Sequence, residues 1–159
     1  MNNSVNYQDL KKAAQDIYSN IDSVFSPIFN EKITFSAEGF SHIIFKNNNS
    51  IREESSQFLR FKLLPLAKKL IGISTTYQEF EETIKEFDIK KYKKKIKENR
   101  LVKYWGIIAI IDGQKIKVII RKIGNNGSLH FWSVIPAWVT NKYRDTKFYT
   151  TMHGNPEED

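Results

Sequence analysis

Three apolar, β-branched segments in the last third of the chain constrain its fold more than any other feature. Only short connections separate them, and these are rich in Gly, Asn and Asp. The segments are Leu101–Ile111, Gln114–Ile123 and Ser128–Ile135. Segments of this kind joined by such connections are typical of hairpins with tight turns. The sequence therefore predicts a three-stranded antiparallel meander.

The length of each turn determines which residues lie opposite one another. A two-residue type I′ turn at Asp112 and Gly113 places Arg121 opposite Tyr104. A second two-residue turn at Asn126–Gly127 places Arg121 opposite Trp132 and Ile123 opposite His130. Because side chains alternate with period two, Tyr104, Arg121, His130 and Trp132 would then share one face.

The opposite face of this meander is the predicted core. An odd loop before the last strand would reverse that strand and put Ser133 beside Arg121. We favour the even loop because it keeps the apolar side chains of the last strand inside. The predicted core face consists of Trp105, Ile107, Ala109, Ile116, Val118, Ile120, Leu129, Phe131 and Ile135.

Upstream of the meander, helical periodicity and capping signals predict a mainly helical region. The predicted elements are a helix over Tyr7–Phe25, a short strand at Ile33–Phe35, a helix capped by Ser36 and ending near Phe45, a helix opened by a capping box at Ser50–Glu53 and ending near Lys62, a helix over Leu64–Ile71 with Pro65 in its first turn, and a more helical than extended segment over Glu79–Ile96. The fold class predicted from this order is α+β.

Composition limits the partners and the chemistry. The formal net charge of +7 indicates an anionic partner, with nucleic acid ahead of a membrane surface. The chain has no cysteine, which excludes disulfides, thiolate nucleophiles and cysteine-ligated zinc. No signal peptide and no apolar stretch of about 20 residues is present, so we expect a soluble, cytoplasmic protein.

The length of 159 residues fits a single domain. We divide it into an N-terminal helical region (1–30), a core (31–138) and a C-terminal tail (139–159). The tail ends in acidic residues, which either dock on a basic face of the protein or fray.

Lysines are concentrated in the segment Lys90–Lys97. One interpretation is a solvated helix face. The other is an electrostatic footprint for phosphates, in which the release of counterions supplies much of the affinity. The two interpretations are compatible.

Arg121 and His130 indicate a specific chemistry if they share a face. RNA cleavage without a metal needs a base for the 2′-hydroxyl, an acid for the leaving 5′-oxygen and a cation for the phosphate. Histidine serves the first two roles and arginine the third. His42 lies on a predicted helix, where Gly39 would allow a close approach to the sheet. His153 lies in the tail.

Four short motifs together resemble a known family. They are Gly39–His42, Arg60–Leu64, Lys117–Arg121 and His130–Ser133. As an ordered set they resemble the phage-associated branch of the barnase–EndoU–colicin–RelE-like RNase superfamily, over about residues 31–138. The resemblance implies N-terminal helices packed on a twisted antiparallel sheet of about four strands. It also implies a toxin-like, metal-independent endoribonuclease with its site on the sheet face.

The site residues carried over from this resemblance are His42, Arg60, Arg121, His130 and Ser133. Two features depart from the family pattern. No carboxylate lies in the strands of Arg121 and His130, and the lysine-rich segment has no obvious counterpart. Both departures leave the identity of the general base open.

The leading hypothesis is therefore an endoribonuclease that cleaves by 2′-hydroxyl attack and leaves a cyclic phosphate. The alternatives are a non-catalytic RNA-binding module using the same face, or a DNA-interacting accessory protein of a mobile element. The expected partners are RNA, with tRNA as one candidate, and an inhibitor or antitoxin protein; no cofactor or metal is expected. The expected RNA contacts are Lys46, Lys93, Lys94, Lys95, Tyr104, Lys117 and Trp132.

Overall fold

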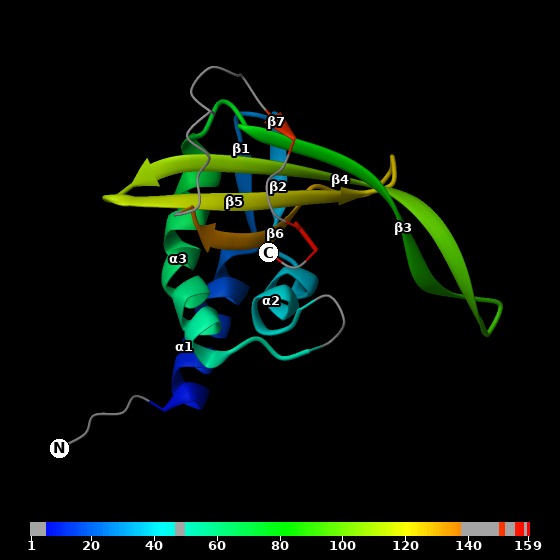
Figure 1. Cartoon of the computed structure of the whole chain (residues 1–159), viewed down its shortest axis with the longest axis horizontal. Helices are drawn as coiled ribbons and strands as arrows, with labels where there is room; N and C mark the ends of the chain where they lie inside the picture. Colours follow the sequence, from blue (N-terminus) through cyan, green and yellow to red (C-terminus); the bar gives the residue numbers. More distant parts are fainter. Residues whose placement is uncertain (1–5, 47–49, 138–149, 152–154, 158) are drawn as a thin grey trace.

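Three helices and one mixed sheet make up the part of the chain that the computed structural model describes, which is residues 6–46, 50–137, 150–151, 155–157 and 159. The α+β class is thus as predicted (Figure 1). The helices are α1 (Tyr7–Ile21), α2 (Ala37–Ile44) and α3 (Glu54–Ile73). The strands are β1 (Ser23–Ser26), β2 (Glu31–Thr34), β3 (Glu79–Lys91), β4 (Lys94–Ile111), β5 (Gln114–Ile123), β6 (His130–Pro136) and β7 (Thr150–Thr151).

The sheet is larger than the predicted one. Its strand order is β1-β2-β6-β5-β4-β3-β7. The four central strands, β3 to β6, are antiparallel to one another. Strands β4, β5 and β6 contain the predicted meander, whereas β3 was predicted to be mainly helical, and the whole sheet has more than the four or so strands that the resemblance implies. The outer strands β2 and β7 pair with the central ones in parallel.

The first turn of the meander is the predicted one. Asp112 and Gly113 both have positive φ, 48° and 77°, as a type I′ turn requires. The register that follows places Arg121 opposite Tyr104. We call the face that carries these two side chains the site face.

The second turn differs from the prediction. Strand β5 ends at Ile123 and β6 begins only at His130, so the connection is longer than two residues. Arg121 therefore pairs with His130, where the sequence-based register had paired it with Trp132. His130 nonetheless lies on the site face, as predicted.

A β-bulge in β6 changes the rest of that strand. Ile120 pairs with Phe131 but Ile119 pairs with Ser133, so Trp132 is an extra residue between them. Trp132 clusters with Tyr104 and Ile119 on the site face, and Ser133 lies there too because it pairs with Ile119. Beyond the bulge Val134 is in the main core, and Ile135, predicted to be there, is not.

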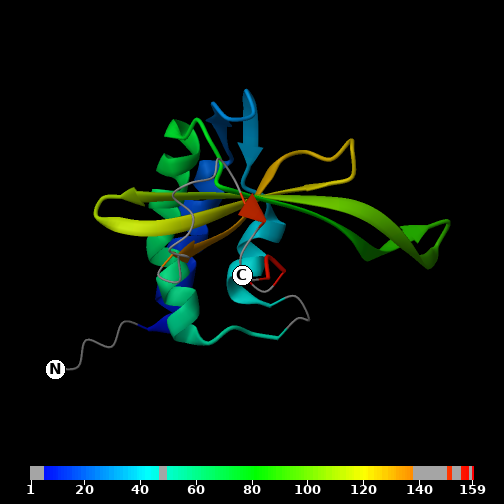
Figure 2. The same ribbon diagram turned by 45° about the horizontal axis from the view of Figure 1, so that its top comes forward.

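The segment Glu79–Ile96, predicted to be mainly helical, is extended. Strands β3 and β4 form a long hairpin whose turn is Tyr92 and Lys93, both at positive φ. The distal part of this hairpin projects well beyond the rest of the sheet (Figures 1 and 2). The lysine-rich segment is therefore a hairpin tip, and the interpretation as a helix face is wrong.

Three helix predictions also need correction. The helix predicted to open with a capping box at Ser50–Glu53 begins at Glu54, because Ile51 pairs with Phe45 in an isolated bridge and Glu53 is the N-cap. The first helix ends at Ile21, and the residues up to Ser26 form β1. The two helices predicted on either side of Pro65 are one continuous helix, α3. Its buried side chains continue past the proline at helical spacing, and their burial stabilises the helix against the lost hydrogen bond. Among the described residues, no helix is long and apolar enough to span a membrane.

Helix α2 packs against β6, which among the described residues pairs with β2 only at His130 and is open on that side beyond it. The close approach requires Gly39, as the sequence indicates. A Cβ at this position would lie 2.6 Å from the main-chain oxygen of Phe131 and 2.4 Å from the hydroxyl oxygen of Tyr18. Ile43 of α2 is fully buried in the main core, while His42 reaches the site face.

We expect Gly39→Ala to lower the free energy of unfolding by about 1–3 kcal/mol, because the added methyl group meets a main-chain atom that cannot easily move. The matched control is Gly72→Ala in α3, where the nearest atom would be 3.5 Å from the new Cβ. This control should gain up to about 1 kcal/mol from helix propensity. Urea denaturation measures both changes, and equal effects at the two positions would contradict the packing described for α2.

Candidate functional site

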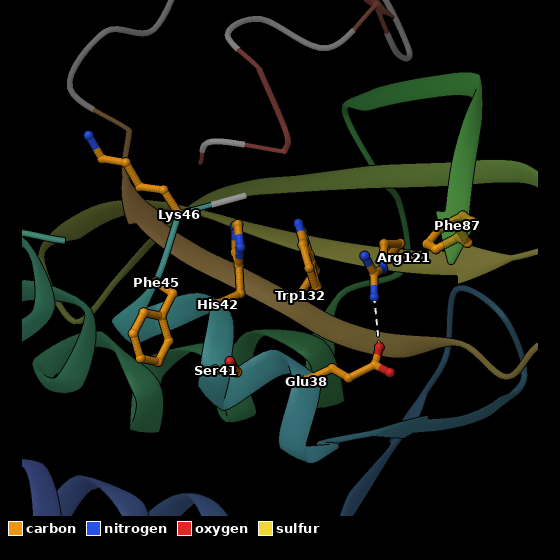
Figure 3. A pocket seen from close by; sticks show the side chains of 8 residues that line it. All are labelled: Glu38, Ser41, His42, Phe45, Lys46, Phe87, Arg121 and Trp132. Atoms are coloured by element: carbon orange, nitrogen blue, oxygen red, sulfur yellow. Dashed lines mark hydrogen bonds and ion pairs between the residues drawn. The ribbon is translucent and has the colours of Figure 1, made fainter. Parts of the chain in front are cut away.

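A pocket of about 270 Å³ lies where α2 meets the site face (Figure 3). Helix α2 and the residues that follow it supply one wall, and β3, β5 and β6 supply the other. The lining residues are Glu38, Ser41, His42, Phe45, Lys46, Phe87, Arg121 and Trp132. Two residues of the predicted site, His42 and Arg121, are thus brought to one pocket.

Arg121 makes three contacts in this pocket. Its Nε donates to Nε2 of His130 over 2.8 Å, and its Nη2 lies 2.9 Å from Oε2 of Glu38. Its guanidinium carbon lies 3.5 Å from the centroid of the Trp132 ring, a cation–π contact. Burial lowers the pKa of Arg121 to about 10, and the ion pair with Glu38 opposes that shift. The arginine keeps its charge at neutral pH.

His130 is held as a neutral imidazole. Its Nε2 accepts from Arg121, so its ring proton belongs on Nδ1, which lies 3.2 Å from the main-chain oxygen of Ser128. Burial, with the charge of Arg121 as a second cause, lowers the pKa of His130 to about 4. His130 contacts Arg121 without itself lining the pocket.

His42 has a similar environment on the other side of Trp132. Its ring is stacked on the indole with centroids 4.0 Å apart, and its Nε2 lies 3.1 Å from Nη2 of Arg52. Burial, followed by the charge of Arg52, lowers its pKa to about 2. Figure 3 shows the indole between His42 and Arg121. The two histidines of the predicted catalytic pair are therefore separated by Trp132.

Arg60 and Ser133 form a separate contact on the site face. Nη1 of Arg60 donates to Oγ of Ser133 over 2.9 Å. Neither residue lines the pocket that contains Arg121. The five predicted site residues are thus arranged as two groups on one face of the sheet.

The predicted RNA-contacting residues differ in accessibility. Lys46 is exposed at the pocket, and Lys93, Lys94 and Lys95 are exposed at the hairpin tip. Tyr104 is fully buried and Trp132 is 7% exposed, so neither offers the open stacking surface that the sequence predicts. Lys117 is also buried, and it forms an ion pair with Glu79 at 3.3 Å.

Sequence reasoning missed several residues of the site. Glu38 supplies the carboxylate that the strands lack, and its side chain is 69% exposed. A signal for it exists, because residues four apart lie on the same side of a helix and Glu38 precedes His42 by four. Arg52, whose Nε donates to the main-chain oxygen of His42, follows a segment without helical or strand periodicity and has no such signal.

The described residues contain no group of three or more His, Cys, Asp or Glu side chains that could hold a metal ion. His153 lies outside the described residues. The chain matches no protein-family model, no curated protein and no solved structure. The chemistry of the site is therefore argued from its geometry.

The buried histidines predict a loss of stability in mild acid. Their pKa values are lowered in the folded protein, so below about pH 6.5 the unfolded chain binds protons that the folded one does not. The free energy of unfolding should fall from about pH 6.5 to about pH 4, by up to about 1.4 kcal/mol per pH unit for each histidine.

Urea denaturation at a series of pH values measures this fall. His42→Asn and His130→Asn should each make the dependence shallower, whatever their effect on stability at neutral pH. A pH dependence that is identical in the two variants and the wild type would contradict the neutral, buried state of these imidazoles.

Proposed function

We propose that the protein is a metal-independent endoribonuclease that cleaves RNA by attack of a ribose 2′-hydroxyl on the adjacent phosphate. The observation that carries the proposal is the pocket in which Arg121 contacts both a carboxylate, Glu38, and an imidazole, His130. A fixed cation beside groups that can accept a proton is the arrangement this reaction requires. The resemblance to the barnase–EndoU–colicin–RelE-like superfamily supports the same activity and a fold of that type.

Arg121 binds and stabilises the phosphate in this proposal. Charge-assisted hydrogen bonds from arginine to phosphate are stronger than its hydrogen bond to a neutral imidazole. A phosphodiester in the pocket would therefore compete with Glu38 and His130 for the hydrogen bonds that the guanidinium donates. Lys46, at the same pocket, adds a second cation.

The geometry favours Glu38 as the group that takes the proton from the 2′-hydroxyl. Its carboxylate lines the pocket and is largely exposed, whereas His130 is 8% exposed and lies behind the lining residues Arg121 and Trp132. His130 then acts as a positioning residue for the guanidinium. This assignment supplies the carboxylate base that neither strand contains.

His42 is the pocket group available to protonate the leaving 5′-oxygen. In the free protein the low pKa of His42, about 2, makes the protonated form rare at neutral pH. Burial is the main cause of that low pKa and the neighbouring arginines are the next. A bound phosphodiester would place negative charge near the ring and offset the effect of the arginines. Acid catalysis by His42 is thus coupled to substrate binding.

A non-catalytic RNA-binding module is the second candidate. It is favoured by a specific observation, since both imidazoles have Nε2 engaged by an arginine. The deciding experiment is incubation with tRNA and with a structured RNA in EDTA, followed by end-group analysis. A 2′,3′-cyclic phosphate end, absent from a 2′-deoxy control substrate, supports the nuclease. Intact RNA that is nevertheless bound supports the binding module.

Substitutions test the assigned roles. Glu38→Gln and Arg121→Lys should each lower kcat/KM by a factor on the order of 10² or more, because one removes the base and the other removes the planar fork of donors. The matched controls are Glu31→Gln and Lys122→Ala; Lys122 lies next to Arg121 on β5 and projects from the opposite face. These controls should cleave normally. Wild-type rates for Glu38→Gln together with inactive His130→Asn would transfer the role of base to His130.

The hairpin tip should contribute to affinity through salt-sensitive contacts. Replacing Lys93, Lys94 and Lys95 with glutamine should reduce the slope of log Kd against log salt concentration by up to about 2 for single-stranded RNA. The control replaces Lys12, Lys32 and Lys68, which are exposed elsewhere and give the same change in net charge. Equal slopes for the two triple variants would show that the tip does not contact RNA.

A further inference from the structure

A second group of buried cations lies on the site face, away from Arg121. Arg60 is 7% exposed, Lys117 is 5% exposed and Ser133 is fully buried. Lys117 and Arg121 are on the same strand four residues apart, which is roughly 13 Å along β5. Arginine, lysine and a hydroxyl are the donors that proteins commonly use for phosphate.

Asp159, near the end of the sequence, contacts all three side chains of this group. Ser133 Oγ donates to the main-chain oxygen of Asp159 over 2.5 Å, and Arg60 donates to the same oxygen. The carboxylate of Asp159 lies 3.7 Å from Nζ of Lys117. An acidic residue therefore meets all three donors through its oxygens.

The same segment continues across the site face toward the pocket. The main-chain oxygen of Pro156 accepts from Nε1 of Trp132 over 2.9 Å. The carboxylate of Glu157 accepts from the hydroxyl of Tyr104 and pairs with Lys85. We call Asn155–Glu157 with Asp159 the acidic segment. Its oxygens engage donors on both sides of Trp132, the residue that forms a wall of the pocket.

Because these charged groups are buried, leaving them without partners would be costly in free energy. Desolvation lowers the pKa of Arg60 to about 9, and the charge of Asp159 opposes that shift. Burial likewise raises the pKa of the Asp159 carboxyl, although Lys117 and Arg60 act in the opposite direction. Buried cations need anionic partners. Glu79 pairs with Lys117 at 3.3 Å, and the acidic segment adds oxygens at Arg60 and on the other side of Lys117, where an external anion would otherwise bind.

We propose that Arg60, Lys117 and Ser133 form a second phosphate-binding subsite for RNA, and that the acidic segment fills this subsite until RNA displaces it. The inference rests on the proposed function, because it extends the RNA path from the Arg121 pocket along the site face. RNA phosphates and the oxygens of the acidic segment compete for one set of donors. The acidic segment is thus an intramolecular inhibitor of RNA binding.

The test uses the full chain carrying Glu157→Gln with Asp159→Asn. These substitutions remove the charges that pair with Lys117 and Lys85, whereas the main-chain oxygen of Asp159 that accepts from Ser133 and Arg60 remains. Fluorescence anisotropy with a labelled single-stranded RNA should show affinity about tenfold higher than wild type, the gain expected if loss of the two charges releases a segment that fills the subsite about nine-tenths of the time. The control pair, Asp16→Asn with Glu31→Gln, removes the same charge from exposed positions. Adding Ser133→Ala to the first pair should reverse most of its gain.

The outcomes separate this inference from the nuclease activity. Tighter RNA binding by the first pair than by the control pair, with no cleavage by any variant, supports the subsite and refutes the nuclease. Cleavage with equal affinities in the two pairs overturns the subsite and leaves the nuclease in place. A gain that survives Ser133→Ala also overturns the subsite, because the added affinity would then arise elsewhere. Circular dichroism at the assay temperature establishes that each variant is folded.

Discussion

The extra residue in β6 determines what the site face can present. In an unbroken strand, Trp132 and Ser133 would point to opposite faces, and one of them would enter the core. The bulge at Trp132 lets both stand on the site face while Phe131 and Val134 remain in the core. The position of Trp132 in the pocket wall and the position of Ser133, which accepts a hydrogen bond from Arg60, therefore both depend on this one bulge.

Burial and electrostatics keep the imidazoles of the free site neutral and its cations paired. The two imidazoles are kept neutral because each is desolvated and faces an arginine. The cations in turn are compensated by carboxylates, with Glu38 on Arg121 and Glu79 on Lys117. An anionic ligand could replace those carboxylates beside the cations at little electrostatic cost. In the proposed mechanism, binding the phosphate and releasing Glu38 to act as a base are one event.

The sequence predicts the parts of the fold that rest on local signals. The turn at Asp112 and Gly113 contains residues suited to positive φ, and it fixes Arg121 opposite Tyr104. The turn at Tyr92 and Lys93 contains no such residue, and residues 90–100 around it are exposed on both faces, so they lack an apolar alternation. The charge-rich segment then resembles a helix. The bulge has no sequence signal either, because it depends on contacts with residues distant in the sequence. Ser133 contacts Arg60, and Val134 packs in the main core.

The distribution of charge predicts an order of events for RNA binding by the proposed mechanism. Cations at the site are buried and compensated by nearby carboxylates, so their field falls off over a short distance. The lysines at the hairpin tip are exposed, and at physiological salt their field extends about 8 Å into solvent. RNA would therefore meet the tip first, and the tip raises the local concentration of phosphate near the site. Phosphate can replace the carboxylates only once the RNA has been brought close. In this mechanism the tip therefore determines the rate of encounter, and the buried arginines determine how the bound RNA is held.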